Sequence, residues 1–217
     1  MTETSQLIPL RPYAALLIKR GTEKVLVVAD LHIGWEVALA AEGVHVPSQT
    51  PKLLKRLSHL VESYKPSRLI ILGDVKHTIA KIEMEEWRDV PTFFEQLSKV
   101  APRVQVIPGN HDGNLEPLLP ENIEILPANG ETIFDTGLFH GHTWPKPEIL
   151  GCKNLVVGHV HPVVVFRDRI GFRITRQVWV KARCDPSRLA RFVLKRAGIK
   201  VEKEPLDTRS TPSNLLI

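Results

Sequence analysis

The sequence predicts an α/β fold in which two sheets pack face to face with helices on the outside. Up to residue 107, apolar segments alternate with helical patterns, as in parallel sheets whose strands are joined by crossover helices. From residue 123 the apolar segments become short and follow one another with tight turns, which favours a second, mixed or antiparallel sheet. At 217 residues, the chain fits one domain that buries roughly 70% of its unfolded surface.

The first sheet is expected to begin with a hairpin. Residues 13–18 and 25–29 are predicted strands, because both are apolar runs and a glycine turn separates them. A short helix is expected over 34–43, and a longer one begins at Thr50 and Pro51, residues typical of a helix start. Further elements are predicted at 68–72 and 103–107 (strands), 91–100 (helix) and 114–119 (short helix), with an irregular acidic segment at 78–89 that is expected to cover the site or mediate self-association.

The second sheet is expected to consist of short strands. Residues 172–182 alternate between apolar and polar side chains, although Arg176 interrupts the apolar face. Residues 189–194 fit a helix or a strand equally well. We predict one domain over 1–201 and a flexible C-terminal tail over 202–217, where Pro, Ser and Thr accumulate. The short strands are expected at 123–126, 131–134, 138–139, 155–157 and 163–166.

Composition and charge suggest a cytoplasmic protein with an anionic partner. The two cysteines, Cys152 and Cys184, lack CxxC spacing, which favours a reducing compartment. No apolar run approaches the ~20 residues that span a membrane, and the first residues lack the pattern of a signal peptide. Between residues 167 and 200, eleven Lys or Arg stand against two acids, a local charge of +9 in a chain of net charge +5. Such a segment binds polyanions or forms a solvated face.

Polar side chains follow five of the apolar runs at the point where each run ends. One such ending would mean little, but five in order predict one site, because ligands of α/β sheets bind at the carboxyl ends of the strands. The endings are Asp30 and His32; Asp74; Asn110, His111 and Asp112; His140 and His142; and His159 and His161.

These residues form a ligand set suited to two divalent metal ions. Carboxylate, imidazole and amide groups without a thiolate favour Mn, Fe, Zn or Ni. Seven ligands exceed what one tetrahedral ion takes, so two ions are expected. A carboxylate shared between them holds such a pair roughly 3.5–4 Å apart, the geometry that activates water against phosphate esters. The predicted ligands are Asp30, His32, Asp74, Asn110, His140, His159 and His161.

The order DLH, GDVKH, GNHD, HGH and GHVH, between residues 30 and 161, resembles the calcineurin-like metallophosphoesterases. This resemblance implies a four-layer αββα sandwich of two mixed sheets, with a dinuclear site between the sheets. It also implies Mn²⁺ as the metal, with Fe, Zn or Ni as alternatives. In the implied arrangement Asp30, His32 and His161 hold one ion, Asn110, His140 and His159 hold the other, and Asp74 bridges both.

The same resemblance implies which residues are catalytic. His111 occupies the position of the imidazole that contacts the leaving oxygen, and Asp112 is expected to orient it. His77 departs from the family pattern, in which the second motif usually ends in a carboxylate or amide. Its role is left open between support of the ligands, substrate contact and a plain surface position. His142 is an alternative ligand or substrate contact beside His140.

A narrower resemblance points to nucleic acid. The segments DLHIGWE, GVHVP, GDVKH and HGHTWP look like the prokaryotic phosphoesterases associated with DNA ligase and helicase-type repair genes. This implies a DNA nuclease in repair that uses a metal-bridging hydroxide and works beside a ligase or helicase, with a single-strand endonuclease as one form of that activity. Trp35 and Trp144 are candidates for stacking on a base or for ordinary packing. The alternatives are a phosphoesterase of small phosphodiesters, cyclic nucleotides or phosphomonoesters, and an inactive scaffold; the sequence predicts no oligomeric state.

Overall fold

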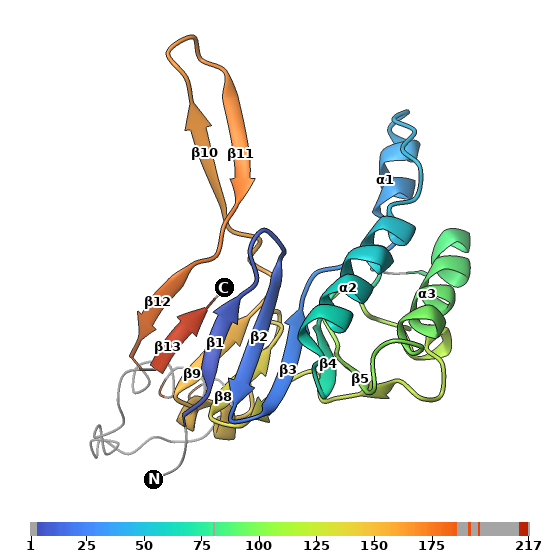
Figure 1. The fold of residues 1–217 in the computed structure, drawn as a ribbon. Helices are drawn as coiled ribbons and strands as arrows, with labels where there is room; N and C mark the ends of the chain where they lie inside the picture. Colours follow the sequence, from blue (N-terminus) through green and yellow to red (C-terminus); the bar gives the residue numbers. More distant parts are fainter. Residues whose placement is uncertain (1–3, 80, 186–190, 192–194, 196–212, 217) are drawn as a thin grey trace.

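Two mixed sheets lie face to face in the computed structural model, and the long helices cover the outer side of the first (Figure 1). The structure describes residues 4–79, 81–185, 191, 195 and 213–216. The predicted α/β class with two mixed sheets is therefore confirmed. None of the helices that the structure describes is long and apolar enough to span a membrane.

The first sheet has the strand order β1-β2-β3-β4-β5-β6. The hairpin predicted at Gly21 is present, and β3 to β6 run parallel to one another. We placed residues 123–126 in the second sheet, but β6 pairs with β5, and Glu124 binds Arg103 at 2.7 Å. A strand of two residues is too short for its sequence to reveal its partner. The strands are β1 (Gln6–Pro9), β2 (Ala15–Arg20), β3 (Glu23–Val28), β4 (Arg68–Leu72), β5 (Val104–Ile107) and β6 (Glu124–Ile125).

Helices α2 and α3 supply the outer layer. Their apolar faces pack on the residues of β3, β4 and β5 that point away from the second sheet. Helix α3 begins at Met84 rather than at the predicted residue 91, because Glu83 and Glu86 form a capping box upstream of Pro91. The acidic segment is thus largely the start of a helix. The helices are α1 (Trp35–Ala41), α2 (Thr50–Tyr64), α3 (Met84–Leu97) and the 3₁₀ turn η1 (Glu116–Leu118).

The second sheet has the order β12-β13-β9-β8-β7. Strands β8, β9 and β13 are parallel, and β7 and β12 run antiparallel at the two edges. Residues 213–216 of the predicted tail form β13, while 202–212 and most of 189–194 lie outside the described residues. The strands are β7 (Glu131–Ile133), β8 (Thr136–Phe139), β9 (Asn154–Val157), β12 (Lys181–Cys184) and β13 (Ser213–Leu216).

The apolar run 69–72 is continuous because both of its faces are buried. Leu69 and Ile71 point into the core under the helices, whereas Ile70 and Leu72 point into the core between the sheets. Each fully buried side chain of this kind contributes roughly 1.5–3 kcal/mol. On the outer side of the second sheet, the 3₁₀ turn η2 (Pro147–Gly151) packs Ile149 against Leu155. These cores fix the strand ends on which the candidate site is built.

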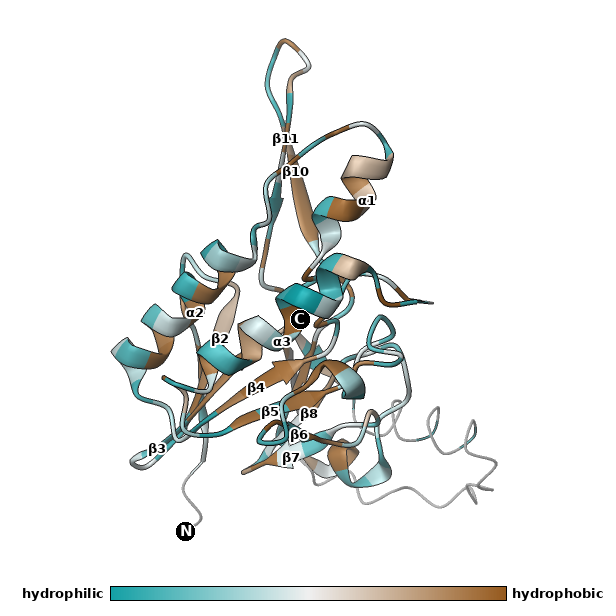
Figure 2. Cartoon of the chain, turned by 90° about the vertical axis from the view of Figure 1, so that its right-hand side faces the viewer, coloured by the Kyte–Doolittle hydropathy of each residue, from teal (hydrophilic) through white to brown (hydrophobic). Residues whose placement is uncertain are grey.

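Strands β10 (Val163–Arg167) and β11 (Arg173–Gln177) form a separate two-stranded ribbon that projects from the body (Figures 1 and 2). The alternation over 172–182 predicted a single strand. In the structure it is divided into β11 and β12, because the chain leaves the ribbon after Gln177 and enters the second sheet at Lys181. The same alternation fits a ribbon and a sheet, so the sequence could not show the break.

Candidate metal centre

The predicted ligands lie at the carboxyl ends of five strands. Asp30 and His32 follow β3, Asp74 follows β4, and Asn110 follows β5, all three strands being parallel. The other three ligands follow the parallel strands β8 and β9 of the second sheet. The two sheets therefore deliver all seven side chains to one edge of the sandwich, as the sequence predicted. Those from the second sheet are His140, His159 and His161.

The main chain is strained at these positions. Among the described non-glycine residues, eight have a positive φ, and five of these are predicted ligands. Left-handed backbone at a non-glycine residue costs about 1–3 kcal/mol and persists where the surrounding structure enforces it. The strained residues are concentrated at the predicted ligands, which indicates that the fold enforces this backbone conformation to direct those side chains toward the site. The five are Asp30 (φ 55°), His32 (46°), Asp74 (51°), His159 (66°) and His161 (46°).

One group of candidate ligands joins the two sheets around Asp30. Ligand atoms of Asp30, His32 and His161 lie within 4.8 Å of one another, and His161 Nε2 is 3.2 Å from Asp30 Oδ1. The Asp30 carboxylate also accepts the main-chain amide of His159 at 3.2 Å. Burial lowers the pKa of His32 to about 4. Its imidazole is therefore neutral at neutral pH, the form that binds a metal.

A second group lies around His140, which is fully buried. Its Nδ1–H donates to the carbonyl oxygen of Leu72 at 3.0 Å, so Nε2 is left as the atom that faces the site. Nε2 lies 3.4 Å from Asp74 Oδ2 and 3.3 Å from Asn110 Oδ1. Ligand atoms of Asp74, His140 and His159 lie within 4.8 Å of one another. With Nδ1 protonated, the neutral ring turns the Nε2 lone pair toward the oxygens of Asp74 and Asn110, an arrangement that either a proton on Nε2 or a metal ion satisfies, so the residues fit a metal ion.

The raised pKa of His140 also indicates that this site attracts a cation. Burial alone would lower its pKa, but the hydrogen bonds to Asp74 and Leu72 and the charges of Asp74 and Asp30 raise it above the usual value. The carboxylates thus create a negative potential strong enough to overcome the burial of an imidazolium. In the described part of the chain, only imidazoles lie within ion-pair distance of Asp30 and Asp74. A divalent cation would satisfy that potential.

Asp74 lies between the two groups. Its Oδ2 is 3.8 Å from His32 Nε2 on one side and 3.4 Å from His140 Nε2 on the other. Burial would raise the pKa of Asp74, but the hydrogen bonds from His140 and from the main-chain amide of His111 lower it to about 2. The carboxylate is therefore ionised and lies within reach of both groups.

Two glycines make this approach possible. A side chain at Gly73 would fall on the ring of His140, and one at Gly109 would collide with the main chain and carboxylate of Asp74. Both glycines lie directly before or beside the ligands in the motifs GDVKH and GNHD. Their role is to let backbone and side chains approach closely.

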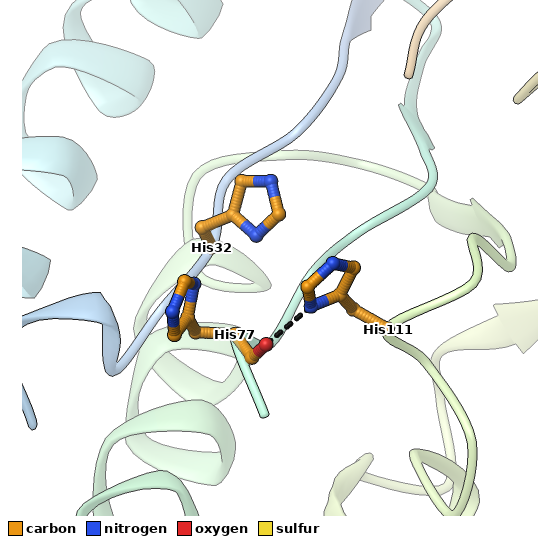
Figure 3. A group of neighbouring side chains, drawn as sticks. All are labelled: His32, His77 and His111. Carbon is orange, nitrogen blue, oxygen red and sulfur yellow. Dashed lines mark hydrogen bonds between the residues drawn. The ribbon is translucent and has the colours of Figure 1, made fainter. Parts of the chain in front are cut away.

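His111 is held by a main-chain oxygen. Its Nδ1 contacts the carbonyl oxygen of His77 (Figure 3), and its Nε2 lies 3.9 Å from Asp74 Oδ2. We expected Asp112 to orient this ring. In the structure the Asp112 carboxylate instead accepts the amides of Val75 and Gly109, each at 2.8 Å. Asp112 therefore ties together the loops that follow β4 and β5.

His77 lies at the site and not on the open surface. Its ring centroid is 5.4 Å from that of His32 and 5.7 Å from that of His111, and the three rings offer nitrogen atoms within 4.8 Å of one another (Figure 3). Its Nδ1 is buried without a hydrogen-bond partner in the described structure. Support of the ligands and substrate contact are the two roles that this position leaves. His142 is exposed, with its ring 5.2 Å from that of His140, at the rim of the site.

Sequence reasoning missed Glu86, a fully buried residue of α3. Its carboxylate accepts the main-chain amides of His77 at 3.0 Å and of Thr78 at 2.7 Å. Because the carbonyl oxygen of His77 holds the ring of His111, Glu86 positions that ring through the loop between them. The available signal was the spacing of Glu83 and Glu86, which is that of a capping box.

Replacing Glu86 with glutamine is expected to loosen this loop. Oε1 accepts the amides of His77 and Thr78, and Oε2 accepts the amide of Glu83 at 3.1 Å; in glutamine one of these oxygens becomes an NH₂ group that cannot accept, which leaves an amide unpaired at a cost of about 1–3 kcal/mol. If His111 is the acid that the motif resemblance implies, we expect about tenfold slower hydrolysis of an alkyl phosphodiester and a smaller loss with a nitrophenyl diester, because a good leaving group needs a proton less. The exposed Glu95→Gln on the same helix is the control. Equal losses on both substrates would assign Glu86 a purely structural role.

A cavity of about 370 Å³ opens beside His32. It lies between α1, α2 and the base of the ribbon, and its wall combines an indole, two cations and two amides with the carboxylate of Glu36. The other residues that supply these groups are Trp35, Gln49, Lys52, Arg56 and Gln177.

Comparison with known proteins identifies the family in which this order of motifs occurs. The family model described as calcineurin-like phosphoesterase matches residues 23–159, which include every predicted ligand except His161. A solved structure described as the crystal structure of Pseudomonas putida nuclease MPE is similar to the chain at 27% identity and a TM-score of 0.48, covering 78% of this chain and 79% of that one. No curated protein matches the chain.

Proposed function

The chain belongs to the calcineurin-like phosphoesterases and is a metal-dependent hydrolase of phosphate esters, and from this premise we propose that it is a dinuclear phosphodiesterase that cleaves DNA. The observation that carries the proposal is the position of Asp74, whose carboxylate faces His32 on one side and His140 on the other. A single ion would not need ligands on both sides of one buried carboxylate.

The proximity of the residues supports an assignment to two ions. The first ion would be held by Asp30, His32 and His161, the second by Asn110, His140 and His159, with Asp74 shared. Oxygen and imidazole donors without thiolate suit Mn²⁺, with Fe, Zn and Ni as alternatives. When bound, such a pair supplies an activated water molecule and neutralises the phosphate oxygens.

His111 would supply the proton that the leaving group needs. Its Nδ1–H donates to the carbonyl oxygen of His77, which leaves Nε2 to face the site. As an imidazolium, it gives the Nε2 proton to the leaving alkoxide as the P–O bond breaks, and the products are an alcohol and a phosphomonoester. The main-chain amide of the same residue holds Asp74 Oδ1 at 2.9 Å, so the acid and the bridging carboxylate are positioned together.

Charge supports a nucleic-acid substrate. The basic segment 167–200 is described over residues 167–185, 191 and 195, and its arginines on the ribbon are exposed. Lys52 and Arg56 add two cations to the cavity beside His32. Such cations contact phosphates flanking the scissile bond, where affinity depends on salt. We propose DNA repair in the cytoplasm, beside a ligase or helicase, as the setting; this part rests on the sequence motifs.

A second candidate is a phosphoesterase of small phosphodiesters, cyclic nucleotides or phosphomonoesters. The cavity of about 370 Å³ beside His32 favours it, because that volume lies within the range of pockets for small molecules. The two candidates differ in whether contacts beyond one nucleotide increase the rate.

A parallel assay separates them. Protein supplied with Mn²⁺ is incubated with a labelled single-stranded oligonucleotide, the same sequence as duplex, a cyclic nucleotide and a nitrophenyl phosphodiester. We expect kcat/KM on the single strand to exceed that on the nitrophenyl diester by at least tenfold, and a chelator to abolish all activity. Hydrolysis of the small esters with no cleavage of either DNA would support the second candidate and contradict the first.

A further inference from the structure

The β10–β11 ribbon projects from the body with both faces exposed (Figures 1 and 2). Its two strands pair in register from Val163 opposite Gln177 to Arg167 opposite Arg173. An isolated two-stranded ribbon is marginally stable in water, and clustered exposed apolar side chains mark a surface that another molecule covers. The ribbon therefore has the features of a binding element that lacks its partner.

One face of the ribbon carries aromatic and apolar side chains together with Arg176, which is directly opposite Val164. Residues directly opposite in an antiparallel pair share a face, so Phe166 and Ile174 lie together, with Phe172 two residues before Ile174 on the same side. Phe166 is 57% exposed and Phe172 is 64% exposed. Two aromatic rings presented to solvent in this way offer platforms on which flat ring systems stack.

The other face carries Val163 and Val165 and, toward the turn, an unbalanced pair of cations. Arg167 and Arg173 are directly opposite each other, an arrangement that like charges destabilise. The nearby Asp168 is used within the turn, where Oδ1 accepts the amides of Ile170 and Phe172 at 2.9 Å each. Neither arginine has a carboxylate within ion-pair distance in the described part of the chain. An anionic partner would relieve the repulsion between them.

The base of the ribbon adjoins the metal centre. β10 begins two residues after the candidate ligand His161. At the base of the ribbon, the main-chain amide of Val178 donates a hydrogen bond to the carbonyl oxygen of Pro162 at 3.0 Å. Gln177, the last residue of β11, lines the cavity that opens beside His32. A chain molecule bound along the ribbon would thus be led toward the candidate ligands.

We propose that the ribbon is an arm that holds a single strand of nucleic acid, with bases stacked on Phe166 and Phe172 and phosphates beside Arg167 and Arg173. The proposal rests on the nuclease function. It identifies the ribbon as the part of the protein that makes it cleave polymers in preference to small phosphodiesters. A single strand offers both unpaired bases, which match the aromatic rings, and a line of phosphates, which match the arginines of the ribbon. A second copy of the chain fits less well, because it would bring two arginine-rich ribbons together.

Substitutions on each face test the arm separately. Phe166→Ser with Phe172→Ser removes both rings, and we expect about 30-fold weaker binding of a single-stranded oligonucleotide, measured by fluorescence anisotropy. Phe166→Trp with Phe172→Trp keeps the rings and is expected to keep the affinity. Arg167→Ser with Arg173→Ser should reduce the slope of log K against log salt by about 1.4, since each phosphate contact to a single strand contributes about 0.7.

The control removes the same charge elsewhere. Lys55→Ser with Lys99→Ser deletes two exposed cations on other elements and is expected to change neither affinity nor slope. The ratio of kcat/KM for the oligonucleotide to that for a nitrophenyl diester should fall at least tenfold in the two Ser double variants of the ribbon and stay constant in the Trp double variant and in the control.

The outcomes separate the arm from the nuclease function. Oligonucleotide cleavage with unchanged affinity, slope and ratio in all ribbon variants would overturn the arm and leave the nuclease standing. Ribbon-dependent binding without any cleavage by the unmodified protein would support the arm and contradict the nuclease. Unchanged DNA binding together with conversion of a dimer to a monomer, measured by light scattering, would overturn the arm in favour of a second copy.

Discussion

Replacing Asp74 with asparagine is expected to lower phosphodiester turnover by about 10³-fold and to remove at least one of two bound Mn²⁺ ions. The carboxylate faces His32 Nε2 and His140 Nε2 at 3.8 and 3.4 Å, and it accepts the amide of His111. An amide has one acceptor oxygen for these tasks, and its NH₂ group would point a donor where a metal is expected. The charge that holds the two ions together is lost as well.

The measurement is metal content by mass spectrometry on protein loaded with Mn²⁺ and then desalted, together with kcat on a nitrophenyl diester. Glu121→Gln, which neutralises an exposed carboxylate outside the candidate centre, is the control and should keep both values. Asp74→Asn protein that retains two ions per chain and normal kcat would show that this residue bridges nothing.

The convergence of the ligands could be predicted because it follows from strand direction. Residues 69–72 are apolar without interruption, so the strand is buried on both faces, and the polar residue after Gly73 must lie at its carboxyl end. The same reasoning applies to each parallel strand. The order of the strands and motifs in the sequence was therefore sufficient to predict that Asp30, Asp74 and Asn110 lie at one edge of the first sheet.

Contacts that depend on side-chain direction could not be predicted in this way. Asp112 follows His111 directly, and adjacency suggested that one orients the other. The carboxylate instead accepts the amides of Val75 and Gly109, because the turn after β5 directs it inward under the loop. Glu86 was missed for a related reason, since its partners, the amides of His77 and Thr78, belong to a loop whose path no periodicity reveals.

The sequence also could not predict which sheet a short strand joins. Residues 124–125 join the first sheet and 213–216 the second, although neither segment has a length or alternation that predicts a partner. Because proline is common in the first turn of a helix, Pro91 led us to predict the start of α3 too late; in the structure it lies inside the helix. Packing against the first sheet, and not local preference, decided that helix.

Replacing His111 with alanine is expected to keep both metal ions while lowering the hydrolysis of DNA by about 10²–10⁴-fold. The substitution removes the ring but preserves the main-chain amide that holds Asp74 Oδ1 at 2.9 Å, so the bridging carboxylate keeps its position. DNA has an alkoxide leaving group that requires a proton, whereas nitrophenolate leaves without one. We therefore expect the loss on a nitrophenyl diester to be much smaller than the loss on DNA.

Metal content decides between an acid and a ligand at this position. His32, His77 and His111 offer nitrogen atoms within 4.8 Å of one another, so the geometry also allows His111 to bind an ion (Figure 3). Under that alternative, His111→Ala protein would lose Mn²⁺ and both substrates would slow equally. The exposed His45→Ala variant controls for loss of an imidazole elsewhere. Because Nδ1 of His111 is already engaged by the carbonyl of His77, only Nε2 faces the site, and a proton on that atom accounts for a loss that depends on the leaving group.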